Sequence, residues 1–176
     1  MAKFETRSPK NQRIDLVESS PLSSPITLLI EPVSVCSLKC IFCPTGDYSL
    51  SKSTGKFQGK IDYDLYKKII QDCVDKKWKI KTLHLQKDGE PMLHPRYIDL
   101  CNLAGDSGVF DKIETTTNAT MFPTMDLKRL AKSGLTRIKI SIYGINEDDY
   151  LKNCRTNINF EKLVDKIDEL YQLCKE

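Results

Sequence analysis

The sequence is short of several features, and each shortage excludes a class of protein. Its 27 lysines and arginines are nearly balanced by 24 acidic residues, and a net charge of +3 is too small to indicate a nucleic-acid partner. No apolar run reaches the roughly 20 residues that a membrane span needs, so no membrane partner is expected. The seven cysteines are an odd number, and no apolar leader stands at the N-terminus. A disulfide framework is therefore disfavoured, and we expect a cytoplasmic protein.

The composition that is present suits one folded domain. Hydrophobic residues make up 40% of the 176 residues, which is enough for a single core. Residues 1–24 are polar and rich in serine, which predicts a loosely ordered lead-in. Residues 25–176 form the predicted domain.

Strands and helices alternate along that domain. Short apolar runs between turn residues predict strands at residues 26–33, 81–86, 110–117 and 138–143. Apolar residues at spacings of three and four predict helices at residues 63–77, 95–105, 125–133 and 160–174, with Asp62 and Asn159 as caps. Residues 45–60 are predicted to be a long loop. Four strand–helix units in this order predict an α/β fold of barrel type, with a parallel sheet and right-handed crossovers.

Three cysteines, Cys36, Cys40 and Cys43, stand in one short stretch directly after the first predicted strand. Several thiolates on one loop suit a soft metal centre. A structural zinc site takes four protein ligands, and an electron-transfer iron–sulfur cluster usually takes four cysteines. A 4Fe–4S cluster held by three cysteines leaves one iron open to bind another molecule. The count of three therefore favours a chemical role over a structural one.

Zinc is the main alternative for this loop. A zinc ion needs a fourth ligand, and the nearby sequence offers none. The next cysteine is Cys73, and the only histidines are His84 and His94. A zinc site would require the fold to bring one of these residues to the loop.

Polar residues follow or close the other three predicted strands. Residues 88–91 come after the second strand, Asn118 closes the third, and Ser141 lies in the fourth. Each taken alone has an ordinary explanation as a turn residue or a satisfied core hydroxyl. Because parallel strands present their carboxyl ends at one edge of the sheet, the four loops together predict a single site there.

The stretches CSLKCIFCP, DGEP, TNAT and SIYG, in this order, resemble the radical S-adenosylmethionine (radical SAM) superfamily, over about residues 26–176. The resemblance implies that three cysteines hold a 4Fe–4S cluster whose fourth iron binds S-adenosylmethionine. It implies reductive cleavage to a 5′-deoxyadenosyl radical, which abstracts a substrate hydrogen. The motifs are most similar to members that carry a C-terminal SPASM extension, among them enzymes that modify peptides or sugar-like molecules.

The resemblance also implies the roles of individual residues. Cys36, Cys40 and Cys43 match the cluster ligands and are the implied catalytic residues. The implied cofactor-binding residues are Phe42 beside the adenine, Gly89, Glu90 and Pro91 in the turn that binds the methionine amino group, Ser141 near the ribose, Arg155 on the methionine carboxylate, and Asn118 facing the cofactor or the substrate. A flavodoxin or ferredoxin is the implied electron donor, and the implied substrate is a peptide or a sugar-like small molecule.

The family barrel has six strand–helix units, whereas this sequence provides four. We therefore expect a partial barrel that stops before strands five and six and leaves the fourth strand as an open edge. Such an edge predicts self-association and slow or absent turnover. Three functions stay open: a radical SAM enzyme or its N-terminal catalytic portion, a fragment that binds a cluster without catalysis, and a zinc or redox module without S-adenosylmethionine.

Overall fold

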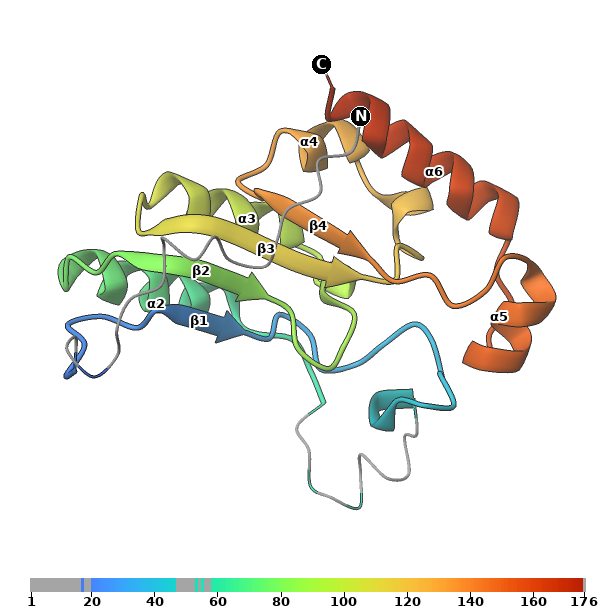
Figure 1. Ribbon diagram of the computed structural model, residues 1–176, viewed down its shortest axis with the longest axis horizontal. Helices are drawn as coiled ribbons and strands as arrows, with labels where there is room; N and C mark the ends of the chain where they lie inside the picture. The colour runs from blue at the N-terminus through green and yellow to red at the C-terminus, as the bar shows by residue number, and fades with distance from the viewer. Residues whose placement is uncertain (1–16, 18–19, 47–52, 54, 56–57, 176) are drawn as a thin grey trace.

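Four parallel strands form the centre of the molecule. A computed structural model describes residues 17, 20–46, 53, 55 and 58–175 (Figure 1). The strands are β1 (Thr27–Ile30), β2 (Ile80–Leu85), β3 (Phe110–Thr117) and β4 (Arg137–Ile140), hydrogen-bonded in the order β1-β2-β3-β4. The prediction of an α/β fold with four parallel strand–helix units is confirmed. Most of the predicted lead-in and of the predicted loop at 45–60 lies outside the described residues.

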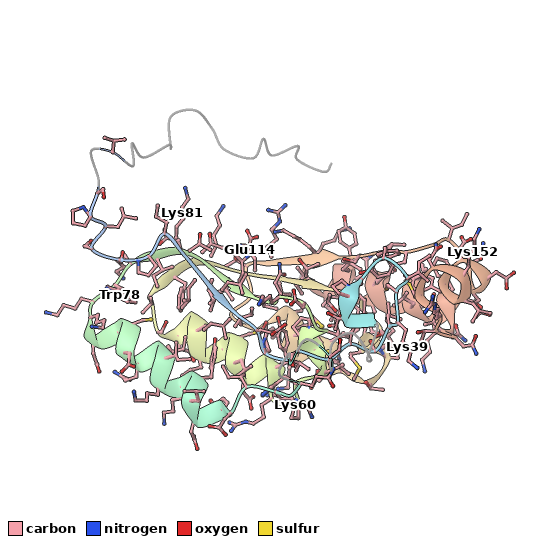
Figure 2. The ribbon with its side chains drawn as sticks, turned by 90° about the horizontal axis from the view of Figure 1, so that it is seen from below. Lys39, Lys60, Trp78, Lys81, Glu114 and Lys152 are labelled. Carbon is pink, nitrogen blue, oxygen red and sulfur yellow. The ribbon has the colours of Figure 1, made fainter. Side chains whose placement is uncertain are left out.

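Helices follow the strands along the chain, and most of them cover one face of the sheet. They are α2 (Tyr63–Asp75), α3 (Tyr97–Asp106), α4 (Leu127–Ala131), α5 (Glu147–Cys154) and α6 (Phe160–Leu173), with short 3-10 turns η2 (Pro44–Gly46), η3 (Pro91–Leu93) and η4 (Phe122–Thr124). Figure 2 shows α2 and α3 on one side of the sheet, while Lys81 and Glu114 lie on the other side. None of the helices in the described part of the chain is long and apolar enough to cross a membrane.

The caps predicted from the sequence begin two of these helices. The side chain of Asp62 accepts a hydrogen bond from the backbone N–H of Leu65, and that of Asn159 accepts one from Lys162. Each satisfies one of the free N–H groups at a helix start. Both predictions are confirmed.

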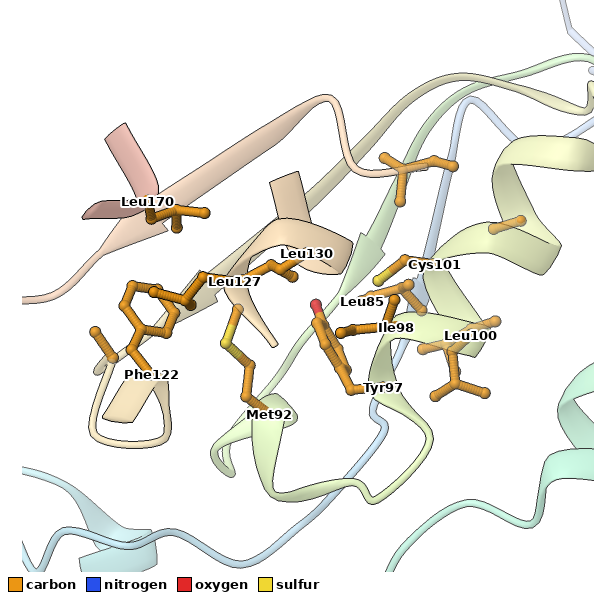
Figure 3. Close-up of a cluster of buried hydrophobic side chains, with 14 of the residues drawn as sticks. Leu85, Met92, Tyr97, Ile98, Leu100, Cys101, Phe122, Leu127, Leu130 and Leu170 are labelled. Carbon is orange, nitrogen blue, oxygen red and sulfur yellow. The ribbon is translucent and has the colours of Figure 1, made fainter. Parts of the chain in front are cut away.

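The core fills the space between the sheet and the helices on that face. Leu85 from β2 meets Tyr97 and Leu100 from α3, and Phe122 and Leu130 extend the cluster towards α6 (Figure 3). Burying each such side chain contributes about 1.5–3 kcal/mol to stability. This packing fixes the strands, and thereby the loops that leave their carboxyl ends.

Strands β1 and β4 each end three residues earlier than the sequence predicts, and β2 ends one residue earlier. Strand β4 stops at Ile140 rather than at residue 143, because its partner β3 ends opposite, at Thr117, and then turns away. Ser141 is therefore not in the strand, although its backbone N–H still donates to the carbonyl of Thr117 at 2.9 Å. Strand β1 stops at Ile30, opposite Leu85 at the end of β2. In both cases the neighbouring strand sets the end.

Helix α5 was not predicted. Asn146 caps it by accepting a hydrogen bond from the N–H of Asp149, and Tyr150 and Cys154 are its buried residues. It follows β4 and lies at the carboxyl edge of the sheet, next to the cysteine loop (Figure 1). Its position makes it part of the candidate site.

Candidate functional site

A cavity of about 250 Å³ lies at the carboxyl ends of the four strands. All four loops contribute to it, as the sequence predicts. The main lining groups are Cys36, Cys40, Cys43, residues 87–90, residues 116–118, Ser141 and Tyr143. Thiols, a carboxylate, an amide and hydroxyls are thus brought to one place from four separate segments.

The cysteine loop is held at its centre by the end of helix α5. The backbone N–H groups of Lys39 and Ile41, on either side of Cys40, donate to the carbonyls of Cys154 and Asn153, each at 3.0 Å. These carbonyls belong to the last turn of a helix, where they have no partner inside the helix. The loop and the helix therefore satisfy each other's backbone groups.

Two glycines allow the loops to approach closely. A Cβ on Gly46 would lie 2.7 Å from the carbonyl oxygen of Cys40. A Cβ on Gly89 would lie 2.1 Å from the carbonyl oxygen of Val33, in the segment that leads into the cysteine loop. A side chain at Gly46 would open the cysteine loop itself, and a side chain at Gly89 would push the second loop away from the first.

Glu90 joins the loops that follow β2 and β3. Its Oε1 accepts hydrogen bonds from the hydroxyl of Thr117 at 2.7 Å and from the N–H of Met92 at 3.1 Å, while its Oε2 accepts from the N–H of Asn118 at 2.8 Å. The side chain is only 2% exposed. Burial raises the pKa of Glu90, and these hydrogen bonds to the carboxylate oppose the rise.

Asn118 connects the third loop to the first. Its amide Nδ2 donates to the Sγ of Cys36 at 3.5 Å and to the hydroxyl of Ser37 at 3.2 Å. Its Oδ1 accepts from the backbone and the hydroxyl of Thr120 at 2.9 and 2.7 Å. Both ends of the amide are engaged, so its N–H groups are held towards the cysteine loop.

Two thiols of the loop, those of Cys36 and Cys40, have a raised pKa and hold their protons in the absence of a metal. Burial, with a smaller contribution from contact with Cys154, raises the pKa of Cys40 to about 12. Burial also raises the pKa of Cys36. A bound cation reverses this preference, because a coordinating thiol loses its proton. The environment of these cysteines is thus unlike that of a free reactive thiolate.

The residues proposed from the resemblance divide into two groups. Seven line the cavity, namely Cys36, Cys40, Cys43, Gly89, Glu90, Asn118 and Ser141. Phe42 does not, because its ring is 62% exposed and packs against Tyr143 with centroids 5.5 Å apart. Pro91 is buried as the first residue of η3, and Arg155 is exposed as the left-handed cap of α5. The structure therefore does not bring these three into the cavity.

Sequence reasoning missed several residues of the site. Thr117 and Cys154 act through contacts between segments that are far apart in the chain, and no local pattern marks them. Tyr143 was expected only as the last residue of the fourth predicted strand, yet it lines the cavity. Gly46 carried a local signal, since a glycine shortly after a ligand loop permits close approach.

The donor set suits a cluster better than a single ion. Among the described residues, no three His, Cys, Asp or Glu side chains are placed around one point that could hold a metal ion. The three cysteines of a cluster bind different irons and need not meet at one point. Thr45, which lines the cavity, has a buried hydroxyl with no hydrogen-bond partner among the described residues, as expected of a wall that faces a bound group. The residues present therefore fit a 4Fe–4S group.

Comparison with known families agrees with this geometry. Residues 30–175 match the family model described as the radical SAM superfamily.

The chain belongs to the radical SAM superfamily.

Individual relatives match it over part of their length. A tungsten-containing aldehyde ferredoxin oxidoreductase cofactor-modifying protein of Pyrococcus furiosus is 30% identical over 115 residues, which is 65% of this chain and 30% of that protein. The chain spans about 30% of the length of the curated relatives it matches.

Solved structures share the fold. Streptococcus suis SuiB bound to S-adenosylmethionine superposes with a TM-score of 0.61 at 19% identity, covering 90% of this chain and 32% of SuiB. BtrN in complex with AdoMet and 2-DOIA gives a TM-score of 0.58 at 17% identity, covering 80% of this chain and 50% of BtrN. The expectation of a partial radical SAM barrel is thereby confirmed.

Proposed function

We propose that this protein is a radical SAM enzyme, or the N-terminal catalytic portion of one, in which Cys36, Cys40 and Cys43 hold a 4Fe–4S cluster. The chemistry that such a cluster supplies when bound is one-electron reduction of S-adenosylmethionine, which leads to abstraction of a substrate hydrogen. The observation that carries the proposal is that the three thiols and the Gly89–Glu90 turn line one cavity.

The residues of the second and third loops fit the binding of an amino acid group. Glu90 has about four lone-pair positions on its carboxylate and uses three of them within the protein. Because the side chain itself lines the cavity, we place the remaining position there. A cationic amino group placed there would form a charge-assisted hydrogen bond. We assign the methionine amino group of S-adenosylmethionine to this position, with Ser141 towards the ribose.

The substrate is proposed from the relatives. SuiB has been solved with its precursor peptide SuiA, and BtrN with 2-DOIA. We therefore keep a peptide or a sugar-like small molecule as the substrate class, and a flavodoxin or ferredoxin as the electron donor. A SPASM-like subgroup, an oxidoreductase activity and a cytoplasmic location belong to the same proposal.

Anaerobic reconstitution with iron and sulfide tests the cluster. The proposal predicts a brown protein that absorbs at roughly 400 nm, as iron–sulfur charge transfer does. Binding of zinc in preference to iron, without that absorption, would instead support a zinc module. A cluster that forms without any cleavage of S-adenosylmethionine would support the fragment that binds but does not catalyse.

Replacing Glu90 tests the cofactor site. Glu90→Gln is expected to weaken S-adenosylmethionine binding to the reconstituted protein by about tenfold, the loss of one charge-assisted hydrogen bond. Thr117→Val is the matched control, because it removes a hydrogen bond to Glu90 but keeps the charge. Equal affinity in the wild type and Glu90→Gln would show that Glu90 joins the loops but does not bind S-adenosylmethionine.

A further inference from the structure

A fourth thiol lies against the cysteine loop. Cys154 ends helix α5, and its Sγ is 3.4 Å from the Sγ of Cys40, a residue 114 positions away in the sequence. Its side chain is 0% exposed. Neither the cluster ligands nor the cofactor residues assigned above include it.

Backbone hydrogen bonds, as well as side-chain rotamers, bring the two sulfurs together. The backbone hydrogen bonds from Lys39 and Ile41 to the end of α5 flank Cys40 on both sides. They fix the backbone of the loop against the backbone of the helix. Cys40 therefore stands between the cavity, which it lines, and Cys154 behind it.

Which of the two sulfurs is the hydrogen-bond donor depends on whether a metal is bound. Without a metal, the S–H of Cys40 donates to Cys154. A metal-bound Cys40 is a thiolate and has no proton to donate. Only the S–H of Cys154 can then fill the contact, and no water competes at a fully buried side chain.

We propose that Cys154 donates its S–H to the Cys40 thiolate when the cluster is bound, and that it thereby raises the reduction potential of the cluster. This inference rests on the proposed function. Hydrogen bonds to cluster sulfurs are one of the factors that set such potentials. A donor stabilises the reduced state more than the oxidised state, because reduction adds negative charge to the sulfurs. Removing the donor shifts the potential in the negative direction.

The Cys36 sulfur provides an internal comparison. It accepts hydrogen bonds from the Nδ2 of Asn118 and the N–H of Leu38, each at 3.5 Å. Among the contacts of the described residues, Cys154 is the only side chain that pairs with the Cys40 sulfur. Its substitution therefore removes a donor from one defined ligand and leaves the donors to Cys36 in place.

The test is a redox titration of the reconstituted full chain, monitored by electron paramagnetic resonance (EPR). Cys154→Ala is expected to load the same iron as the wild type but to show about a two- to fivefold lower ratio of reduced to oxidised cluster at a fixed potential. Cys154→Ser retains a donor and is expected to stay close to the wild type or above it. Cys73→Ala, which removes a buried thiol on α2, is the matched control and is expected to leave the potential unchanged.

Two results would overturn the inference. One is the same midpoint potential in the wild type, Cys154→Ala and Cys154→Ser. The other is loss of iron from both Cys154 variants, which would make Cys154 a structural support of the loop. If the alanine variant alone does not fold, a serine variant with a potential below that of the wild type also overturns it. Failure of the wild type to load any cluster is a separate result, which refutes the proposed function itself.

Discussion

At the scale of single residues, the site depends on a few buried polar groups that join loops. Glu90 connects the second loop to the third, and Asn118 connects the third to the cysteine loop. Each is less than 5% exposed, so an unmade hydrogen bond costs more there than it would at the surface. The loops around the cavity therefore form a single hydrogen-bonded unit, and a displacement of one loop also displaces the next.

The buried carboxyl of Glu90 predicts a pH dependence of stability. Burial raises its pKa in the folded protein, so the folded state holds this proton more tightly than the unfolded chain does. The contribution to stability is full below the ordinary pKa of about 4.3 and is lost as the pH rises through the folded pKa. As the pH rises from about 4.3 through the folded pKa, the melting temperature of the wild type should therefore fall relative to that of Glu90→Gln.

Thermal unfolding from acid to neutral pH measures this difference. Glu161→Gln, an exposed substitution on α6, is the control and should follow the wild type at each pH. Parallel curves for the wild type and Glu90→Gln would show that Glu90 has the same pKa in both states.

The cysteines predict a second result at this scale. Substitution of Cys36, Cys40 or Cys43 by alanine should abolish iron loading, because each removes one ligand of the cluster. Alanine at Cys73, Cys101, Cys154 or Cys174 should leave the iron content unchanged, since these residues lie in or at the ends of helices and are not proposed ligands. Iron analysis after anaerobic reconstitution decides, and full iron retention by Cys40→Ala would refute the assignment.

At the scale of secondary structure, helix α5 is the element on which the cysteine loop relies. Its last carbonyls accept the N–H groups of Lys39 and Ile41, and Arg155 ends the helix in a left-handed conformation with φ of 48°. Weakening this short helix should loosen the loop, whereas weakening a helix elsewhere should not.

The caps of α5 and α6 test this. Asn146→Ala and Asn159→Ala each remove an N-cap hydrogen bond and should each destabilise the protein by about 1 kcal/mol. Only Asn146→Ala should also speed the loss of iron to a chelator, because the backbone N–H groups of Lys39 and Ile41 in the loop donate to the end of α5. Equal rates of iron loss from both variants would contradict the role of α5.

The limits of sequence prediction also appear at this scale. Strand β3 was predicted with its observed bounds, because turn residues mark both of its ends. Strand β4 was predicted to end three residues too late, since its end depends on where β3 turns away. Helix α5 was missed because it is mostly polar, and the burial of Tyr150 and Cys154 depends on the loops around it. The cysteine spacing is local and pointed to the proposed ligands, but the contact between Cys40 and Cys154 is not local and left no sequence signal.

At the scale of the whole molecule, the sheet has an open side at β4. Within the described residues this strand pairs with β3 alone. Beside it lies a groove of about 520 Å³ between β4, α4 and α6, with Ile138, Ile140 and Val164 among its apolar lining residues. We propose self-association through this edge, because an unpaired strand beside an apolar groove favours pairing with another chain.

Sedimentation of the chain over a range of concentrations tests the proposal. The wild type should form dimers or larger species, and Val164→Lys should shift it towards the monomer by placing a charge in the groove. Val164 is 46% exposed, so the substitution need not disturb the core. Leu151→Lys, at a 52% exposed position on α5, is the matched control. A monomeric wild type at all concentrations would refute self-association.

The central claim is that the cysteine loop and the three loops around it form one site for a cluster and S-adenosylmethionine. Its most direct test is the EPR spectrum of the reconstituted, reduced protein with and without S-adenosylmethionine. We predict a 4Fe–4S signal that changes when S-adenosylmethionine is added, and a smaller change in Glu90→Gln at the same concentration. The absence of an iron–sulfur signal, or a signal that S-adenosylmethionine leaves unchanged, would contradict the claim.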